Sequence, residues 1–253
     1  MASGGNTLPI GFRLEEYQVQ SVLGAGGFGI TYLASDTRLG AQVAIKEYFP
    51  QAYAARSQSA TIATHAVPGA KENYLWGLQE FLKEARALAR FKHVNIVRVL
   101  RFLETHGTAY LVMEYEEGGP LTNVLRRHGG FLDEPTLLSV FLPVLSGLQA
   151  VHEAGLLHLD IKPDNIYLRH GGQPMLIDFG SSRQIRRDVA GASQKIALTP
   201  GYCAPEQYPG HGEVGAWTDL QNAHTRSVLD NLPGRKALEE KLRPLMEVGS
   251  VST

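Results

Sequence analysis

The sequence lacks several features that would place it in common non-enzymatic classes. Its single cysteine, Cys203, cannot form an intrachain disulfide or a multi-cysteine zinc site, which favours a reducing compartment such as the cytoplasm. The 24 Lys and Arg residues are balanced by 25 Asp and Glu residues, so no basic excess drives nucleic-acid binding. The most apolar stretch, Leu137–Leu148, is interrupted and too short for a membrane span. A globular chain of 253 residues, with one large domain or two small ones, is expected.

The first half of the chain predicts a small mixed sheet with one helix. Residues 1–16 are small and polar, and they predict a flexible leader. A helical pattern covers about residues 73–90. The β-favouring runs lie at residues 17–23, 30–34, 42–47, 96–103 and 109–115. We therefore expect an N-lobe over residues 17–115.

The second half predicts a mostly helical lobe. A Gly-containing break at residues 116–119 predicts a hinge between the two lobes. Helices are expected over residues 120–127 and 135–154, and loops from 158 to 209. The predicted fold class is α+β with two lobes, in which the C-lobe covers residues 120–219 and a divergent tail covers residues 220–253.

A glycine-rich run lies between the first two predicted strands. It consists of Gly24, Ala25, Gly26, Gly27, Phe28 and Gly29. Its glycines let backbone amides approach a polyphosphate closely. A dinucleotide-binding turn would need a helix directly after the glycines, whereas residues 30–34 favour a strand. A strand–loop–strand turn is therefore predicted, and a glycine-rich hairpin that binds no ligand is the alternative.

Lys46 and Glu84 are predicted to form an ion pair. Glu84 falls within the apolar stripe of the predicted helix, which consists of Phe81, Ala85 and Leu88. A buried carboxylate needs a cation, because breaking a buried pair costs about 3–5 kcal/mol. Lys46 in the third strand is the natural partner. Glu80, one helical turn earlier, is the alternative, and a lone strand lysine is usually solvated.

Polar residues with a characteristic spacing follow in the second half. Residues 158–165 read His-Leu-Asp-Ile-Lys-Pro-Asp-Asn, and residues 178–180 read Asp-Phe-Gly. Asp160, Lys162 and Asn165 can place a base, a phosphate-binding cation and a metal-binding amide around one point, and Asp178 adds a hard oxygen ligand for Mg²⁺. Taken singly, His158 would be a core histidine and residues 178–180 a turn.

In this order and spacing, the motifs resemble those of the protein kinase family over about residues 17–219. The likeness is closest to bacterial serine/threonine protein kinases. It implies a two-lobed kinase fold that transfers the γ-phosphate of ATP, with Mg²⁺, to Ser or Thr hydroxyls of a protein substrate. One alternative is a non-catalytic nucleotide-binding interaction module, which the retention of every catalytic polar residue disfavours. The other is a small-molecule phosphotransferase, which the glycine loop together with Ala204-Pro205-Glu206 disfavours.

The resemblance implies a role for each matching residue. The glycine loop would cover the phosphates, while Lys46 would hold the α and β phosphates and pair with Glu84. Asp160 would accept the hydroxyl proton, and Lys162 would meet the γ-phosphate. Magnesium would be bound by Asn165 and Asp178. Backbone hydrogen bonds to adenine would come from Glu114 and Glu116, beside a gatekeeper at Met113.

Two departures from the family pattern lie inside the matching region. Leu159 stands where many kinases have an Arg that binds an activation-loop phosphate, so phosphorylation of Ser181, Ser182 or Ser193 is expected to have weak control. Residues 51–71 form a polar insertion, which we interpret as a tolerated surface loop because lengthening a loop costs only ~0.6 kcal/mol per doubling.

A third departure concerns the tail. The likeness ends after about residue 219, and residues 220–253 are polar where further apolar helices would be expected. We therefore expect an incomplete C-lobe. A truncated or frame-shifted product is the favoured interpretation. The alternatives are a partner that covers the exposed lobe and a tail that itself packs on the lobe.

Overall fold

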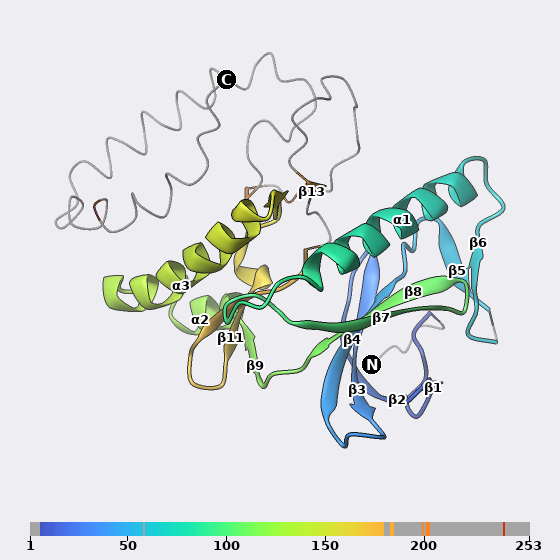
Figure 1. Cartoon of the computed structure of the whole chain (residues 1–253), viewed down its shortest axis with the longest axis horizontal. Helices are drawn as coiled ribbons and strands as arrows, with labels where there is room; N and C mark the ends of the chain where they lie inside the picture. Colours follow the sequence, from blue (N-terminus) through green and yellow to red (C-terminus); the bar gives the residue numbers. More distant parts are fainter. Residues whose placement is uncertain are drawn as a thin grey trace, which may run out of the picture. The chain divides into compact units, whose positions relative to one another are not determined.

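The chain forms two compact units in a computed structural model (Figure 1). The structure describes residues 6–57, 59–179, 183–184, 199, 201–202 and 240. Unit 1 comprises residues 1–92 and 97–117, and unit 2 comprises residues 93–96 and 118–253. The predicted hinge at 116–119 spans the boundary between Glu117 and Gly118.

Unit 1 is built on a six-stranded antiparallel sheet with the strand order β1-β2-β3-β4-β8-β7. The strands are β1 Arg13–Leu14, β2 Tyr17–Ala25, β3 Gly29–Asp36, β4 Gln42–Tyr48, β7 Val99–Thr105 and β8 Thr108–Glu114. All five predicted runs are found as strands. The run at 96–103 starts only at Val99, because Ile96 instead forms a parallel bridge with Leu176 in unit 2.

Side chains on β4 alternate between two faces of this sheet. Lys46 and Tyr48 share one face, and helix α1 (Ala70–Leu88) packs on it, because the Tyr48 ring lies 5.7 Å from the Phe81 ring. Figure 1 shows α1 alongside β7 and β8. Glu84 on this helix is 8% exposed, which confirms that it faces the core. Glu47 points to the opposite face of the sheet.

Residues 6–16 pack against the rest of unit 1, so the prediction of a flexible leader is wrong for these residues. Leu8 and Leu14 are 2% and 0% exposed, and β1 pairs with β2. The amide of Leu8 donates to Tyr32 Oη at 3.1 Å. The polar composition of this segment hid its apolar residues Leu8, Phe12 and Leu14. Residues 1–5 lie outside the described residues.

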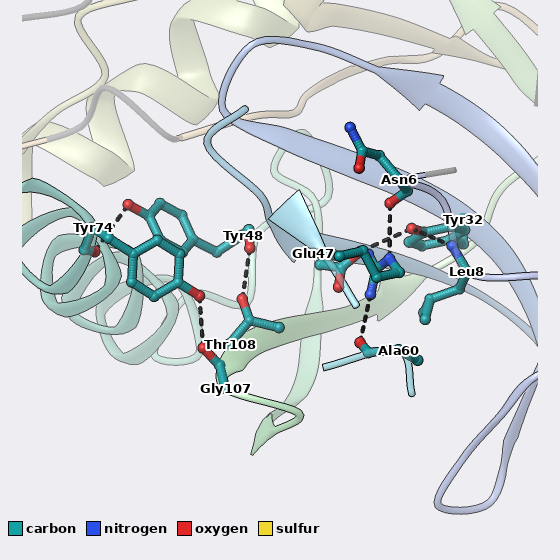
Figure 2. A network of polar contacts seen from close by, with 10 residues as sticks. Asn6, Leu8, Tyr32, Glu47, Tyr48, Ala60, Tyr74, Gly107 and Thr108 are labelled. Carbon is teal, nitrogen blue, oxygen red and sulfur yellow. Dashed lines mark hydrogen bonds and ion pairs between the residues drawn. The ribbon is translucent and has the colours of Figure 1, made fainter. Parts of the chain in front are cut away.

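The insertion at residues 51–71 was interpreted from the sequence as a tolerated surface loop, and the structure corrects this interpretation. It forms a hairpin of β5 (Ala54–Arg56) and β6 (Ile62–Thr64) and leads into α1. The Arg56 side chain is only 3% exposed and pairs at 2.5 Å with Glu47, whose side chain is 0% exposed. Arg56 also donates to Asn6 O at 2.8 Å and to Ala60 O at 2.9 Å (Figure 2). The insertion therefore supplies a buried cation.

The Glu47 carboxylate joins β4 to β3 and to the insertion. Besides Arg56, it accepts a 2.8 Å hydrogen bond from Tyr32 Oη on β3 (Figure 2). Burial, reinforced by the charge of Glu47, raises the pKa of Tyr32, so its phenol stays protonated and donates. Burial alone would lower the pKa of Arg56, but the hydrogen bond and charge of Glu47 outweigh it and raise that pKa. Arg56 therefore keeps its positive charge in the folded state.

Unit 2 combines helices with short strands. Its elements are β9 Gly118–Pro120, α2 Leu121–Arg127, α3 Glu134–Glu153, β10 Leu156–Leu157, the 3₁₀ turn η1 Pro163–Asn165, β11 Ile166–Arg169, β12 Pro174–Leu176 and β13 Arg183–Gln184. Strands β12, β11 and β9 form one sheet, and β10 pairs with β13. Both predicted helices are confirmed, but part of the predicted loop region forms strands. Residues 93–96 belong to this unit because Asn95 Nδ2 donates to Pro174 O at 2.7 Å and Leu176 N donates to Asn95 O at 2.8 Å.

Helix α3 is long and apolar enough, by length and composition alone, to cross a membrane, and it is the one such helix among the described residues. The core helix of a soluble protein passes the same test. Asp133 caps its N-terminus by accepting a hydrogen bond from Thr136 N at 3.1 Å. One side of α3 is buried in unit 2 through Val140, Val144, Gly147 and Val151.

The Arg56–Glu47 pair generates a stability prediction. Arg56→Met leaves a buried carboxylate without its cation, so we expect a loss of about 3–5 kcal/mol in the free energy of unfolding. The matched control is Arg98→Met, because Arg98 and Glu114 form an ion pair whose side chains are 56% and 42% exposed. That control should cost no more than ~1 kcal/mol.

Urea unfolding of both variants measures the difference. Adding Glu47→Gln to Arg56→Met removes the unpaired charge and should recover part of the loss. Equal losses in Arg56→Met and Arg98→Met would contradict a buried, stabilising pair.

Candidate active site

The glycine-rich run forms the turn between β2 and β3, which confirms the predicted strand–loop–strand arrangement. Gly26 N donates to Gly29 O at 2.9 Å and closes the turn. On its other side, Gly27 O and Phe28 O accept hydrogen bonds of 3.2 and 3.0 Å from Gln51 N and Phe49 N. Because the C=O and N–H of one trans peptide point in opposite directions, the amides of Phe28 and Gly29 point away from residues 49–51. Binding of a phosphate by these amides stays a prediction.

The end of the glycine loop lies beside Lys46. A Cβ atom added to Gly29 would be 3.9 Å from Lys46 Cε and only 2.6 Å from Glu47 O. Glycine is therefore required at position 29 by the close approach of β4. The Lys46 side chain therefore lies next to Gly29, the first residue of β3.

Glu84 and the residues expected near adenine also belong to unit 1. Glu84 lies on the buried side of α1, which faces the Lys46 side of the sheet. The pairing of Lys46 with Glu84 stays a prediction. Met113 is 8% exposed, and Glu114 N donates to Arg98 O at 3.0 Å. A backbone hydrogen bond from Glu114 to adenine would therefore have to use its carbonyl oxygen.

In unit 2, the Asp160 carboxylate is held by three side chains. Lys162 Nζ lies 2.8 Å from Oδ2, and Asn165 Nδ2 donates to the same oxygen at 2.9 Å. The other oxygen, Oδ1, accepts from Thr199 Oγ1 at 2.7 Å. Asn165 Nδ2 also donates to Asp160 O at 2.8 Å, which fixes the loop between them. The predicted grouping of Asp160, Lys162 and Asn165 is present in the structure.

Thr199 joins this group from a distant part of the chain. Its hydroxyl donates to Asp160 and accepts from Lys162 Nζ at 3.0 Å. A single hydroxyl thus contacts both the candidate base and the candidate phosphate-binding cation. The spacing of residues 158–165 could not identify Thr199. Its resemblance to the substrate-loop Thr of protein kinases, however, predicts a hydrogen bond near Asp160, and the structure contains that hydrogen bond.

His158 supports the loop from beneath. It is 2% exposed, and its ring centre lies 4.3 Å from that of Phe179. Asp160 N donates to Nδ1 at 3.3 Å, so Nε2 carries the hydrogen and donates to Ile177 O at 3.3 Å. Burial lowers the pKa of His158, which keeps the ring neutral. The core-histidine interpretation is therefore correct, and here the core position shapes the loop.

Two residues of this region have left-handed backbone conformations. Leu159 has φ 63° and Asp178 has φ 58°. Asp tolerates such angles, whereas a bulky Leu does so only where its neighbours impose them. The hydrogen bond between His158 and Asp160 closes the turn around Leu159. Strained backbone of this kind is common at functional sites.

The donor set fits Mg²⁺ better than a transition metal. No group of three or more His, Cys, Asp or Glu side chains that could hold a metal occurs in the part of the chain that the structure describes. Magnesium instead uses one or two carboxylates together with phosphate oxygens and water. Because Asn165 Nδ2 donates to Asp160, Mg²⁺ binding by Asn165 would use Oδ1, and the exposed Asp178 would add a carboxylate.

The candidate residues thus fall into two sets. Unit 1 holds the glycine loop, Lys46, Glu84, Glu114 and Glu116, and unit 2 holds Asp160, Lys162, Asn165 and Asp178. Convergence of both sets on one triphosphate stays a prediction. Ser181, Ser182, Ser193 and the tail, apart from Glu240, lie outside the described residues.

Comparison with known proteins agrees with this arrangement. The chain belongs to the protein kinase domain family, which matches residues 17–220. It is similar to a solved structure, the PpkA-294 apo form, with a TM-score of 0.66 and 39% identity over 70% of this chain and 62% of that chain. The predicted α+β, two-lobed kinase fold is therefore confirmed.

Curated relatives include bacterial kinases. Over 81% of its length, the chain is 34% identical to the serine/threonine-protein kinase pkn2 of Myxococcus xanthus, of which it covers 22%. It is 35% identical to the serine/threonine-protein kinase PksC of Streptomyces coelicolor, with 81% of this chain and 35% of that protein covered. The chain thus spans about a fifth to a third of the length of these relatives. The predicted resemblance to bacterial serine/threonine kinases is confirmed.

The close approach at Gly29 yields a prediction about the glycine loop. Gly29→Ala places a Cβ atom against Glu47 O, so β3 and β4 must separate, and such overpacking costs ~1–3 kcal/mol. We expect a lower unfolding temperature and a smaller stabilisation by Mg²⁺-ATP, both measured by thermal unfolding. At Gly27, an added Cβ meets nothing within 4 Å, so Gly27→Ala is the control for the unfolding temperature. Equal unfolding temperatures for the two variants would refute the steric argument.

Proposed function

We propose that this chain is an ATP- and Mg²⁺-dependent serine/threonine protein kinase domain. The observation that supports this best is the group formed by Asp160, Lys162, Asn165 and Thr199. A candidate base and a cation contact one hydroxyl group, and an amide holds the base in place. This is the chemistry that phosphorylation of an alcohol needs.

In this proposal, Asp160 orients the substrate hydroxyl and accepts its proton. The hydroxyl of Thr199 donates a hydrogen bond of 2.7 Å to Asp160 Oδ1. This contact supports the access of a Thr-sized alcohol to the carboxylate. Lys162, bound to Oδ2 of the same carboxylate, offers its positive charge to the γ-phosphate. Phosphoryl transfer needs little covalent chemistry from the protein, so orientation and charge supply most of the acceleration.

The nucleotide would be bound by unit 1 together with the metal-binding pair. The amides of Phe28 and Gly29 would face the phosphates, Lys46 would hold the α and β phosphates, and Glu84 would orient Lys46. Adenine would meet the carbonyl of Glu114 and the backbone of Glu116. Bound Mg²⁺ would neutralise phosphate charge. Asn165 Oδ1 and the Asp178 carboxylate are the side-chain groups that would hold it.

We further propose that the substrate is a protein with exposed Ser or Thr. The contact between Thr199 and Asp160 favours an alcohol acceptor, and the named kinase relatives support a protein carrying it. A partner that covers the C-lobe and a cytoplasmic location stay predictions.

The direct test is transfer of radiolabelled phosphate from ATP to the chain itself and to a generic Ser/Thr protein. We expect labelling that Asp160→Asn removes, because the amide cannot accept a proton. Equal labelling by both proteins would indicate contamination and refute the proposal. ATP binding with no transfer by either would instead favour the non-catalytic interaction module, and transfer only to small alcohols would favour a small-molecule phosphotransferase.

Lys46→Met and Asp178→Ala should each abolish measurable transfer. Lys46→Met removes the positive charge that would face the phosphates, and Asp178→Ala removes the carboxylate that would hold Mg²⁺. Each loss is worth at least ~3 kcal/mol of transition-state binding. Turnover measured at saturating substrate provides the readout. Wild-type turnover in either variant would exclude the role assigned to that residue.

A further inference from the structure

Helix α1 presents one buried stripe to the sheet, and Glu84 belongs to it. The stripe consists of Tyr74, Gly77, Phe81, Glu84 and Leu88, spaced by three or four residues. Tyr74, Phe81 and Leu88 are 4%, 7% and 2% exposed. The rotation of α1 about its axis that buries these residues therefore also determines where Glu84 points.

Tyr48 lies under this stripe. Its ring centre is 5.3 Å from that of Tyr74 and 5.7 Å from that of Phe81. Its hydroxyl donates to Tyr74 O at 3.1 Å (Figure 2). A Cβ atom added to Gly77 would lie 2.2 Å from Tyr48 Oη and 3.0 Å from its Cζ. The phenol therefore occupies the space that a side chain at position 77 would need.

Two further hydrogen bonds fix this contact at both ends. Thr108 Oγ1 on β8 donates to Tyr48 O at 2.6 Å, and Tyr74 Oη donates to Gly107 O at 2.6 Å (Figure 2). Burial raises the pKa of both tyrosines, so both phenols stay protonated and act as donors over the physiological pH range. The helix is thus bonded to β4 and to the β7–β8 turn.

The glycine makes this contact selective for one rotation of the helix. Shifting α1 by one residue rotates it by about 100° and would bring Trp76 or Leu78 toward the phenol in place of Gly77. Neither side chain fits a space that excludes even a methyl group. Only the observed register is compatible with a Tyr at position 48.

We propose that Tyr48 is a positioning residue of the kinase reaction. By filling the space at Gly77, it sets the rotation of α1 and directs Glu84 toward the sheet face that carries Lys46. Lys46 and Tyr48 are two residues apart on β4. The strand that carries Lys46 therefore also determines the rotation of the helix that carries Glu84. This inference rests on the proposed function, in which Glu84 orients Lys46 for ATP.

Three variants test the inference through ATP kinetics and unfolding temperature. Gly77→Ala drives a methyl group into Tyr48 Oη and should raise the KM for ATP at least ~10-fold, because small misplacements of binding groups are costly. Tyr48→Phe removes only the hydroxyl. Combining Tyr48→Phe with Gly77→Ala relieves the 2.2 Å overlap, so we expect most of the KM effect to be reversed. Leu75→Ala, at an α1 residue that is 48% exposed, is the control and should keep the wild-type KM.

The pattern of rescue separates positioning from a loss of folding. A wild-type KM in Gly77→Ala, or a defect that Tyr48→Phe does not relieve, would overturn the proposal. If Gly77→Ala does not fold, Tyr48→Phe alone is decisive: a raised KM with unchanged unfolding temperature supports positioning, and an unchanged KM overturns it. If the wild-type chain transfers no phosphate, the proposed function fails. The affinity of the same variants for Mg²⁺-ATP, measured directly, then decides the role of Tyr48.

Discussion

A fully buried carboxylate beside the candidate phosphate-binding lysine determines much of the architecture of unit 1. Strand alternation turns Glu47 to the face opposite Lys46, where its side chain is 0% exposed. A charge in that position is tolerated only if a cation and hydrogen-bond donors surround it. Arg56 and Tyr32 supply them, and Arg56 in turn bonds Asn6 O. The N-terminal segment and the insertion are therefore parts of the lobe.

The two faces of β4 contact different parts of unit 1. On one face, Glu47 joins the strand to β3, to the hairpin of β5 and β6, and to the N-terminal segment. On the other face, Tyr48 holds α1 through ring contacts and a hydrogen bond. Lys46 directly precedes Glu47 in the sequence and shares its face of the sheet with Tyr48. Its backbone is consequently restrained from both sides, which is the condition for a binding group to hold a charged ligand without reorganising.

Periodicity and motif spacing predicted the strands, helix α1, the buried position of Glu84 and the grouping of Asp160 with Lys162 and Asn165. They failed for residues whose role depends on a contact with a distant segment, because neither segment contains a recognisable pattern by itself. Arg56 lies in a polar run, and a polar run predicts a loop; only the burial of Glu47 reveals why an Arg is there. Thr199 was missed by spacing for the same reason, since its partners lie 37 and 39 residues away.

The loop formed by residues 158–165 differs from the family pattern at Leu159. At Leu159 no guanidinium exists to bind a phosphate, and the left-handed turn there is closed by the hydrogen bond from Asp160 N to His158 Nδ1. That bond requires a neutral ring, which burial secures by lowering the pKa of His158. Because protonation would turn Nδ1 from an acceptor into a donor, the loop is favoured above the ordinary histidine pKa and loses stability as the pH falls below it. The shape of the loop thus depends on a buried, uncharged histidine and on the donors around Asp160, all within unit 2.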